Sequence, residues 1–315
     1  MKRVVKSKHF QRGALFLVSL LILVGVIFVF TRPLLAPESG DNSLKNASNL
    51  NAELENSTFQ TNNDELLPQG IGEGVQANSF LVYDELTGTT LAAHNPNAPV
   101  AIASLTKLMT AYTVQKYGQL DDEWVIASTS KIGVRPVLGL ETGDKVVVKD
   151  LVDAMLVGSA NDAASSLGEY LQSATKQPAI KTMNQEAKQL GMTSTNYENP
   201  IGFDSEQNYS TAADLKKLLV VIRPIKLFTD IDRKQSYSFT SELGKTYSVK
   251  ATNTLLAGDE EIHAVKTGYT NEAQGAMITA IVHKDKRFII IVLNSPDREG
   301  DTKLLKSQVL KTTLL

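Results

Sequence analysis

The pattern of apolar and polar residues divides the 315-residue chain into three stretches. The first contains an uncharged apolar run over residues 13–30, GALFLVSLLILVGVIFVF. As a helix this run would be about 27 Å long, close to the thickness of the hydrocarbon core of a bilayer. Residues 37–75 follow, rich in Asn, Ser, Glu and Gly and poor in residues that could form a core. From Ser79 onward, short apolar segments alternate with turn residues, as in a globular domain.

Within the globular part, strand-like segments lie at both ends and helical segments lie between them. Apolar and β-branched runs predict strands over residues 79–85, 90–95, 261–269, 275–283 and 287–295. Apolar residues three and four positions apart predict helices over residues 104–118, 149–158, 161–172, 180–191 and 210–222, and a closing helix after Arg298. The predicted fold class is therefore α/β in the mixed α+β sense, with an antiparallel sheet built from both chain ends and a helical subdomain inserted.

The charge distribution gives the apolar run an orientation. The net charge is −2, yet residues 1–36 carry six basic residues and no acidic residue. Five of the six precede the run and only Arg32 closely follows it, so the positive-inside rule places the N-terminus in the cytoplasm. We predict a cytoplasmic basic segment (1–12), a transmembrane anchor (13–31), a disordered extracytoplasmic linker (32–75) and a folded catalytic domain (76–315).

A cleavable signal peptide is the alternative interpretation of the same run. Signal peptides usually have a shorter apolar region and end at a small-x-small cleavage site. Here Leu34, Leu35 and Ala36 are followed by Pro37, which makes a poor site. An uncleaved, single-pass membrane anchor is therefore the favoured interpretation.

Composition excludes several kinds of chemistry. The chain has no cysteine, so it has neither a disulfide framework nor a cysteine nucleophile. The four histidines, His9, His94, His263 and His283, lack the paired spacing of a zinc site, so we expect no metal and no other cofactor. No basic patch of the kind that binds nucleic acid is present in the sequence.

Three short motifs carry the candidate chemistry, in the order S-x-x-K, S-x-N and K-T-G. They lie at residues 104–107 (SLTK), 159–161 (SAN) and 266–268 (KTG). The first two patterns also occur elsewhere, at Ser128/Lys131, Ser173/Lys176 and Ser194/Asn196. The bare patterns therefore decide little, and sequence context must choose among them.

Context favours Ser104 as a nucleophile. Ser104 follows a Pro-containing loop and is predicted to open a periodic helix, which would hold Lys107 beside its hydroxyl group. A helix N-terminus also favours negative charge that develops there. Ser128 lies near Gly133 and Pro136, and Ser173 ends a predicted helix, so neither has this preorganisation.

Each motif also has a purely structural interpretation. Ser104 could be an N-cap residue and Lys107 a solvated lysine. Ser159 and Asn161 could be turn and cap residues at the joint of two helices, and residues 266–268 could be an exposed strand end with a glycine bulge. The ordered occurrence of all three motifs favours the catalytic interpretation.

With these motifs the chain resembles the low-molecular-mass penicillin-binding proteins, the serine D-alanyl-D-alanine carboxypeptidases of bacterial cell walls (peptidase family S11). The segments ASLTKLMTAY, GSANDAASSLGEYL, MNQEAKQLGMTSTNYENPIGF, YSTAADL and VKTGYTNEAQG are also similar to family stretches in the same order. The similarity covers residues 79–295. It implies a fold like that of β-lactamases and DD-peptidases, on the outer side of the bacterial cytoplasmic membrane.

The resemblance also implies an acyl-enzyme mechanism on peptidoglycan stem peptides. Ser104 would attack the carbonyl of the penultimate D-alanine. Lys107, made neutral by burial and by the nearby cation Lys266, would accept the proton. Ser159 would relay a proton to the leaving amine, and Asn161 would hold Lys107 and the substrate amide.

The third motif would bind the substrate. The resemblance implies that Lys266 and Thr267 bind the terminal carboxylate, and that Gly268 lets the substrate backbone approach closely. The backbone N–H groups of Ser104 and Tyr269 would form the oxyanion hole. β-Lactams would acylate Ser104 and act as covalent inhibitors.

Three positions depart from the family pattern. Ala160 stands where the family often has Gly, and Tyr269 stands where many members have His. Thr252, in ATNTLL, replaces the Arg that usually precedes K-T-G. The last change weakens the expected carboxylate site and leaves room for a D,D-endopeptidase that cuts peptidoglycan cross-links.

Two further alternatives stay open. A class A β-lactamase shares the three motifs but needs a deacylating Glu in an E-x-x-x-N context. Neither Glu186 nor Glu198 has an Asn four residues later. A catalytically idle penicillin-binding sensor is the non-enzymatic alternative, and the intact motif residues argue against it.

Overall fold

The computed structural model describes residues 65–66, 70–127 and 133–313. The predicted basic segment, the predicted membrane span, most of the predicted linker and Ser128 lie outside these residues. Among the residues described, no helix has the length and apolar character needed to cross a bilayer. The proposed segment boundaries therefore remain predictions.

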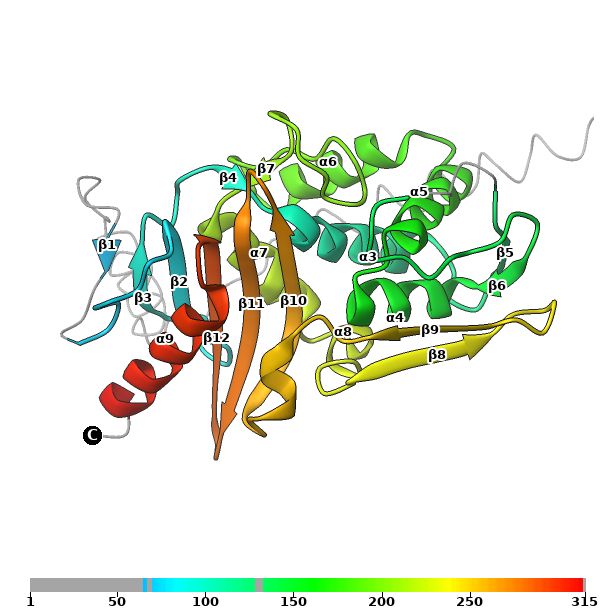
Figure 1. Cartoon of the computed structure of the whole chain (residues 1–315). Helices are drawn as coiled ribbons and strands as arrows, with labels where there is room; N and C mark the ends of the chain where they lie inside the picture. Colours follow the sequence, from blue (N-terminus) through cyan, green and yellow to red (C-terminus); the bar gives the residue numbers. More distant parts are fainter. Residues whose placement is uncertain (1–64, 67–69, 128–132, 314–315) are drawn as a thin grey trace, which may run out of the picture. The chain divides into compact units, whose positions relative to one another are not determined.

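One antiparallel sheet, in the strand order β1-β3-β2-β12-β11-β10, organises the fold (Figure 1). Its strands are β1 (Glu65–Leu66), β2 (Ser79–Asp84), β3 (Thr90–His94), β10 (Ile262–Thr270), β11 (Gln274–His283) and β12 (Lys286–Ser295). Every neighbouring pair is antiparallel. The two chain ends meet where β2 pairs with β12, for example at Val82 and Ile290. The sheet built from both ends of the chain is confirmed.

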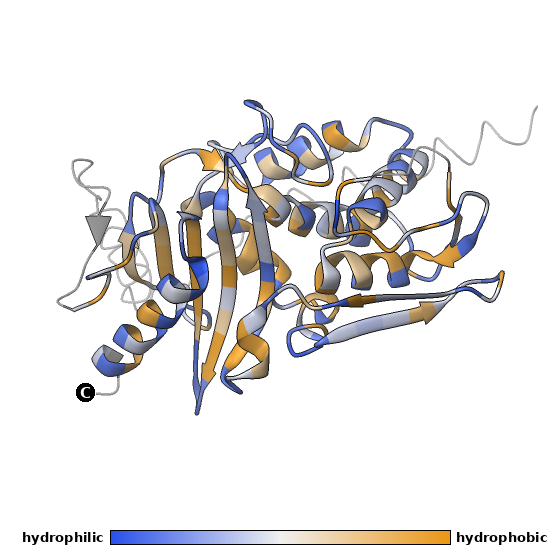
Figure 2. Cartoon of the chain, viewed as in Figure 1, coloured by the Kyte–Doolittle hydropathy of each residue, from blue (hydrophilic) through white to orange (hydrophobic). Residues whose placement is uncertain are grey.

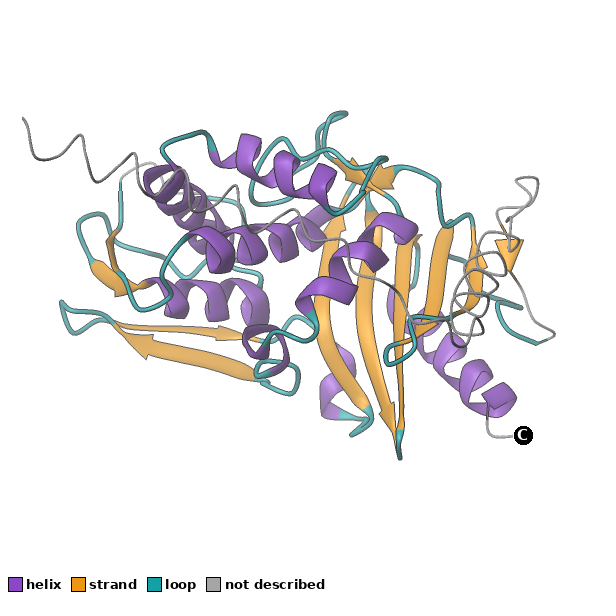
Figure 3. Ribbon diagram, turned by 180° about the vertical axis from the view of Figure 1, so that it is seen from behind, coloured by secondary structure: helices purple, strands orange, loops and turns teal. Residues whose placement is uncertain are grey.

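Helices fill the insertion between β3 and β10 and cover the sheet. The inserted helices are α3 (Thr106–Tyr117), α4 (Val148–Gly158), α5 (Asn161–Thr175), α6 (Ala179–Gln189), α7 (Ala212–Ile222) and α8 (Lys226–Thr229). The closing helix is α9 (Arg298–Thr313). Helix α7 covers one face of the sheet and α9 the other, as Figures 1 and 3 show from opposite sides. The predicted helical insertion is confirmed.

Both faces of the sheet are buried, which explains the continuous apolar strands (Figure 2). In β12, Ile289 and Ile291 pack in the cluster beneath the inserted helices. Their neighbours Phe288 and Ile290 pack on the opposite face, in a cluster that includes Leu305 of α9. Alternate side chains of this single strand therefore pack into two separate hydrophobic cores.

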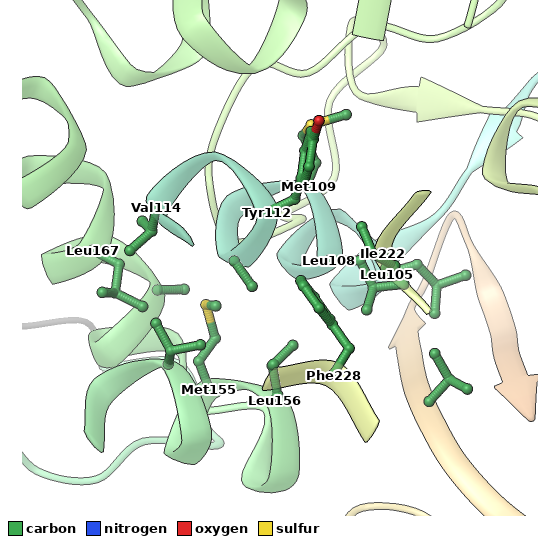
Figure 4. Close-up of a cluster of buried hydrophobic side chains, with 14 of the residues drawn as sticks. Leu105, Leu108, Met109, Tyr112, Val114, Met155, Leu156, Leu167, Ile222 and Phe228 are labelled. Atoms are coloured by element: carbon green, nitrogen blue, oxygen red, sulfur yellow. The ribbon is translucent and has the colours of Figure 1, made fainter. Parts of the chain in front are cut away.

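Helix α3 runs through the centre of the helical subdomain. Its residues from Thr106 to Val114 are all buried, so the helix has no solvent face over this length. Figure 4 shows its apolar side chains packed against others from α4, α5 and α8, among them Met155, Leu167 and Phe228. The start of α3 is therefore held rigidly by the core.

One predicted helix start is wrong, and the interpretation of Asn161 as an N-cap residue is not supported. Ser104 does not open the α-helix, because it lies in a short 3₁₀ turn, η1 (Ala103–Leu105), and α3 begins at Thr106. Asn161 is the first residue of α5 rather than its N-cap, which is Ala160. The side chains of Ser104 and Asn161 do not cap a helix and instead contact Lys107, as described below.

Three strand pairs were missed. They are β4 (Val100–Ala101) with β7 (Tyr209–Ser210), β5 (Glu123–Val125) with β6 (Lys145–Val147), and β8 (Ser236–Thr240) with β9 (Thr246–Lys250). In β9 only Tyr247 and Val249 are buried, and the intervening positions are exposed Thr, Ser and Lys. Such a one-sided strand has a weak apolar signal.

Candidate active site

The candidate nucleophile lies on a turn that packs closely between two glycines. Ser104 is half-buried in η1, and the preceding Ala103 has a left-handed φ of 46°. A β-carbon on Gly202 would lie 1.9 Å from the Ala103 carbonyl oxygen. A β-carbon on Gly268 would lie 2.9 Å from the Ser104 backbone nitrogen. Both positions require glycine, because the loop before β7 and the edge strand β10 approach this turn so closely.

Lys107, one turn further along the chain, is completely buried. Its Nζ lies 2.8 Å from Ser104 Oγ, 2.9 Å from Asn161 Oδ1 and 2.6 Å from the Ile201 carbonyl oxygen. Burial, followed by the charge of Lys266, holds the pKa of Lys107 well below its usual range. Both effects favour the neutral form of the amine.

The partners of Lys107 fix the direction of its hydrogen bond to Ser104. A neutral amine has two N–H donors and one lone pair. Asn161 Oδ1 and the Ile201 carbonyl oxygen can only accept, so they use both donors. The Asn161 amide nitrogen donates to the Val134 carbonyl oxygen at 2.9 Å, which supports this amide orientation. When Lys107 is neutral, its lone pair therefore faces the Ser104 hydroxyl, as a general base requires.

Ser159 and Asn161 occupy the joint between α4 and α5. Ser159 is buried and has a left-handed φ of 59°, which turns the chain sharply between the helices. Its Oγ accepts a hydrogen bond from Lys266 Nζ at 2.9 Å. Two chains of contacts therefore converge on this joint, one from Lys107 through Asn161 and one from Lys266 through Ser159.

Lys266 reaches the joint from the edge strand β10. The register of β10 against β11 shifts between Ala264 and Lys266, and a bulge of this kind redirects the following side chain. Lys266 is buried, and its Nζ also donates to the Thr267 carbonyl oxygen at 3.0 Å. Burial, followed by the charge of Arg298, lowers the pKa of Lys266 to about 7.

Thr267 completes the polar lining on β10. Its Oγ1 lies 2.5 Å from Oγ1 of Thr252, the position where the family usually has Arg. Within the part of the chain that is described, neither Lys107 nor Lys266 contacts a carboxylate. The cluster is therefore suited to receive an anionic group from outside the protein.

Two contacts of the site come from residues that lie in none of the three motifs. The Ile201 carbonyl is presented by a loop in which Asn199 Oδ1 accepts three backbone N–H bonds, from Ile201, Gly202 and Phe203. Arg298, at the start of α9, donates from Nη1 to the Gly268 carbonyl oxygen at 2.6 Å. An N-P-x-G stretch could have indicated the loop, but nothing in the sequence indicated Arg298.

Two of the other motif occurrences lie among the described residues, and both have different surroundings. Ser194 N–H and Asn196 Nδ2 bond to Asp214 and to the Gln207 carbonyl, in a turn outside the cluster. Ser173 and Lys176 lie at the exposed C-terminal end of α5. Neither pair shares a hydrogen bond with the cluster around Lys107, so among the occurrences that the structure describes only those at Ser104 and Ser159 contribute to this cluster.

The carboxylate that would favour a β-lactamase has a structural role. Glu186 of α6 is fully buried, and its Oε2 lies 2.7 Å from Lys116 Nζ. Tyr117 donates to the other oxygen. Glu186 therefore holds α6 against α3 through both of its carboxylate oxygens. The described residues also contain no group of three or more His, Asp or Glu side chains placed to hold a metal ion.

Sequence comparison identifies the relatives of this chain. The family model of D-alanyl-D-alanine carboxypeptidases, Peptidase_S11, matches residues 67–297. The D-alanyl-D-alanine carboxypeptidase DacF of Bacillus subtilis is 26% identical over 73% of this chain and 61% of its own length. A D-alanyl-D-alanine endopeptidase of Pseudomonas aeruginosa is 33% identical over 69% of this chain and 71% of its own length. The match spans about three fifths of the length of DacF, and less of some other carboxypeptidases, such as 57% of Escherichia coli DacC.

Solved structures show the same fold. The Streptomyces K15 DD-transpeptidase superimposes with a TM-score of 0.69 at 27% identity, covering 74% of this chain and 97% of that protein. A homologue of penicillin-binding proteins from Mycobacterium tuberculosis gives a TM-score of 0.70 at 25% identity, covering 78% and 96%. Family model, relatives and fold agree, and the chain belongs to the D-alanyl-D-alanine carboxypeptidase family, Peptidase_S11.

Proposed function

We propose that this protein is a serine D-alanyl-D-alanine carboxypeptidase that removes the terminal D-alanine from peptidoglycan stem peptides. The observation that carries the proposal is the buried Lys107 amine, whose Nζ lies 2.8 Å from Ser104 Oγ and whose pKa is held well below its usual range by burial. Membership of the family supports the same reaction. The substrate follows from the names of the relatives, which include carboxypeptidases and endopeptidases.

Acylation follows from this geometry. Lys107 accepts the hydroxyl proton while Ser104 Oγ attacks the carbonyl carbon of the penultimate D-alanine. The backbone N–H groups of Ser104 and Tyr269 stabilise the oxyanion. The C–N bond to the terminal D-alanine then breaks, and the leaving amine takes a proton through Ser159, which Lys266 contacts at 2.9 Å. The product is an ester on Ser104.

Deacylation reverses the roles with water as the nucleophile. Lys107 takes a proton from the water, the ester bond to Ser104 breaks, and the serine recovers its proton. A β-lactam would follow the first half of this path, since its ring opens when the amide bond breaks but the amine stays attached. Acylation by β-lactams and slow release are therefore part of the proposal.

Carboxylate recognition is assigned to the β10 side of the cluster. Lys266 and Thr267 lie within one hydrogen-bonded group with Ser159 and Thr252, and a terminal carboxylate would supply the anion that this group lacks. Thr252 brings a hydroxyl group where the family usually has a guanidinium. An endopeptidase activity, as named for the P. aeruginosa relative, is the second candidate because of this residue.

Product analysis tests the proposal and separates the two activities. The full chain is incubated with a soluble stem pentapeptide and, separately, with a cross-linked dimer. We expect release of one D-alanine from the pentapeptide and no release by Ser104→Ala. Cleavage of dimers alone would replace the carboxypeptidase by an endopeptidase, and absence of both activities would overturn the proposal.

We also propose that residues 13–31 anchor the protein in the bacterial cytoplasmic membrane with the catalytic domain outside. The basic flank before the apolar run and the extracellular location of peptidoglycan support this arrangement. Protease added to intact spheroplasts should digest the catalytic domain. Protection of the domain from protease would contradict the orientation.

A further inference from the structure

A groove of about 660 Å³ lies between α5 and α6, outside the catalytic cluster. The two helices are neighbours in the helical subdomain (Figures 1 and 3). The α5 wall of the groove consists of one side of that helix, made of Ser165, Gly168, Glu169, Gln172, Ser173 and Lys176. The volume is within the range of small-molecule and cofactor sites.

The α5 wall continues the face of the helix that begins at the catalytic cluster. Asn161 starts α5, and Ser165, Gly168 and Gln172 follow it at spacings of four, three and four residues, which places them on one helix face. The stripe from Asn161 to Gln172 is about 17 Å long, at 1.5 Å per residue. A ligand along this face would therefore lead away from the reacting bond.

The floor of the groove is tied directly to the catalytic base. Pro200 lines the groove, and the next residue, Ile201, accepts the hydrogen bond from Lys107 Nζ at 2.6 Å. Thr110 Oγ1, one turn after Lys107, donates to the Pro200 carbonyl oxygen at 2.8 Å. A β-carbon on Gly168 would lie 2.9 Å from Pro200 Cγ, so this mid-helix glycine lets the floor approach α5.

The lining is suited to an uncharged, hydroxyl- and amide-rich ligand. Gln172 and Ser173 are exposed and offer both donors and acceptors. One acidic and one basic side chain, Glu169 and Lys176, leave no excess of either charge along the wall. Pro178, Ile180 and Pro200 add apolar surface on which a ring face can pack. N-acetylated sugars combine these properties, with hydroxyl and amide groups for the polar side chains and ring faces for the apolar ones.

We propose that this groove binds the N-acetylated glycan strand of peptidoglycan and so holds the polymer while a stem peptide enters the cleft. The proposal rests on the proposed function, because that function defines the polymer. The groove proposal can be tested separately from the proposed function, since a soluble stem peptide without sugar has no part that reaches the groove. The groove should affect reactions on the polymer and leave reactions on the free peptide unchanged.

The experiment compares tryptophan substitutions at two exposed glutamines. Gln172→Trp fills the groove, and Gln189→Trp, at the end of α6 and away from the groove lining, is the matched control. We measure D-alanine release from a soluble pentapeptide and from isolated, sugar-containing peptidoglycan with the full chain. Gln172→Trp should lower the rate on peptidoglycan by about tenfold and leave the pentapeptide rate unchanged, with no loss for Gln189→Trp.

Binding provides an independent measurement. A soluble, uncharged oligomer of N-acetylglucosamine is titrated into the full-length Ser104→Ala protein, and binding is followed by calorimetry. Saturable binding that Gln172→Trp abolishes and Gln189→Trp retains would support the groove. Equal rates of both variants on peptidoglycan, or no binding of the N-acetylglucosamine oligomer, would overturn the groove proposal. Failure of the unmodified enzyme on the pentapeptide would instead overturn the proposed function.

Discussion

Lys107 and Lys266 are two buried amines that serve one site in different charge states. Lys107 must be neutral to accept the Ser104 proton, and burial and the charge of Lys266 both favour the neutral form. Lys266, with a pKa of about 7, can carry the charge that a substrate carboxylate needs. The two roles are therefore linked, because the cation that binds substrate also helps to keep the base deprotonated.

This link predicts a shift in pH dependence. Acylation should rise with pH as Lys107 loses its proton, which gives the acid limb of the profile. Lys266→Gln removes the second cause of the low pKa of Lys107, so that pKa rises and the acid limb moves to higher pH. Acylation by a fluorescent penicillin, measured from about pH 4 to 9, gives the position of the limb even if its height falls. Lys245→Gln, at a surface lysine bonded to Glu141, is the control. An unmoved limb in Lys266→Gln would contradict the coupling.

At the scale of elements, the site depends on how closely β10 meets the turn η1. Gly268 lies against Ala103 and the Ser104 nitrogen, and Arg298 fixes its carbonyl group from α9. The contact places the nucleophile on one element and its carboxylate site on another. A small displacement between them should therefore affect catalysis more than stability.

Gly268→Ala tests this contact. The added methyl group would lie 2.9 Å from the Ala103 β-carbon and from the Ser104 nitrogen, so η1 and β10 must separate. We expect the acylation rate constant to fall by about 100-fold, as for other displacements of reacting groups by about 1 Å. Gly258→Ala is the matched control, since its β-carbon would meet no atom within 4 Å. Equal acylation by both variants would show that the close contact is not needed.

At the scale of the whole molecule, the buried lysines lower the stability of the fold. In the unfolded chain Lys107 would be protonated up to its usual pKa, whereas in the folded protein its pKa lies well below that value. Between the two pKa values the unfolded state binds one more proton, so stability rises with pH in this range. This loss in the free energy of unfolding accompanies the placement of a neutral amine beside Ser104.

Lys107→Met removes this dependence. The free energy of unfolding of the parent should rise with pH by up to about 1.4 kcal/mol per unit from Lys107, a contribution that the variant lacks. The stability of the variant relative to the parent should therefore decrease as the pH rises from the lowered pKa of Lys107 towards the usual lysine pKa of about 10.4. Urea unfolding at several pH values measures it, with Lys226→Met, at a side chain that is 83% exposed, as the control. A constant difference for Lys107→Met would contradict a depressed pKa.

Much of this architecture could be predicted because it depends on local patterns. The apolar runs of β10, β11 and β12 predicted the sheet, and the three-residue spacing predicted that Lys107 meets Ser104. What could not be predicted depends on tertiary contacts. The left-handed Ala103 is held by Gly202 and Gly268 from distant segments, and the Ile201 carbonyl is a backbone group without a side-chain signal. The hairpin of β8 and β9 was missed because Ser and Thr fill its exposed positions.

The most direct test of the account is to locate the acyl group. The full chain is treated with benzylpenicillin, digested, and mapped by mass spectrometry. We predict one penicilloyl group per protein, on Ser104, and none on the Ser104→Ala protein. An adduct on Ser159 or on another serine, or no adduct at all, would contradict the assignment of Ser104 as the nucleophile activated by Lys107.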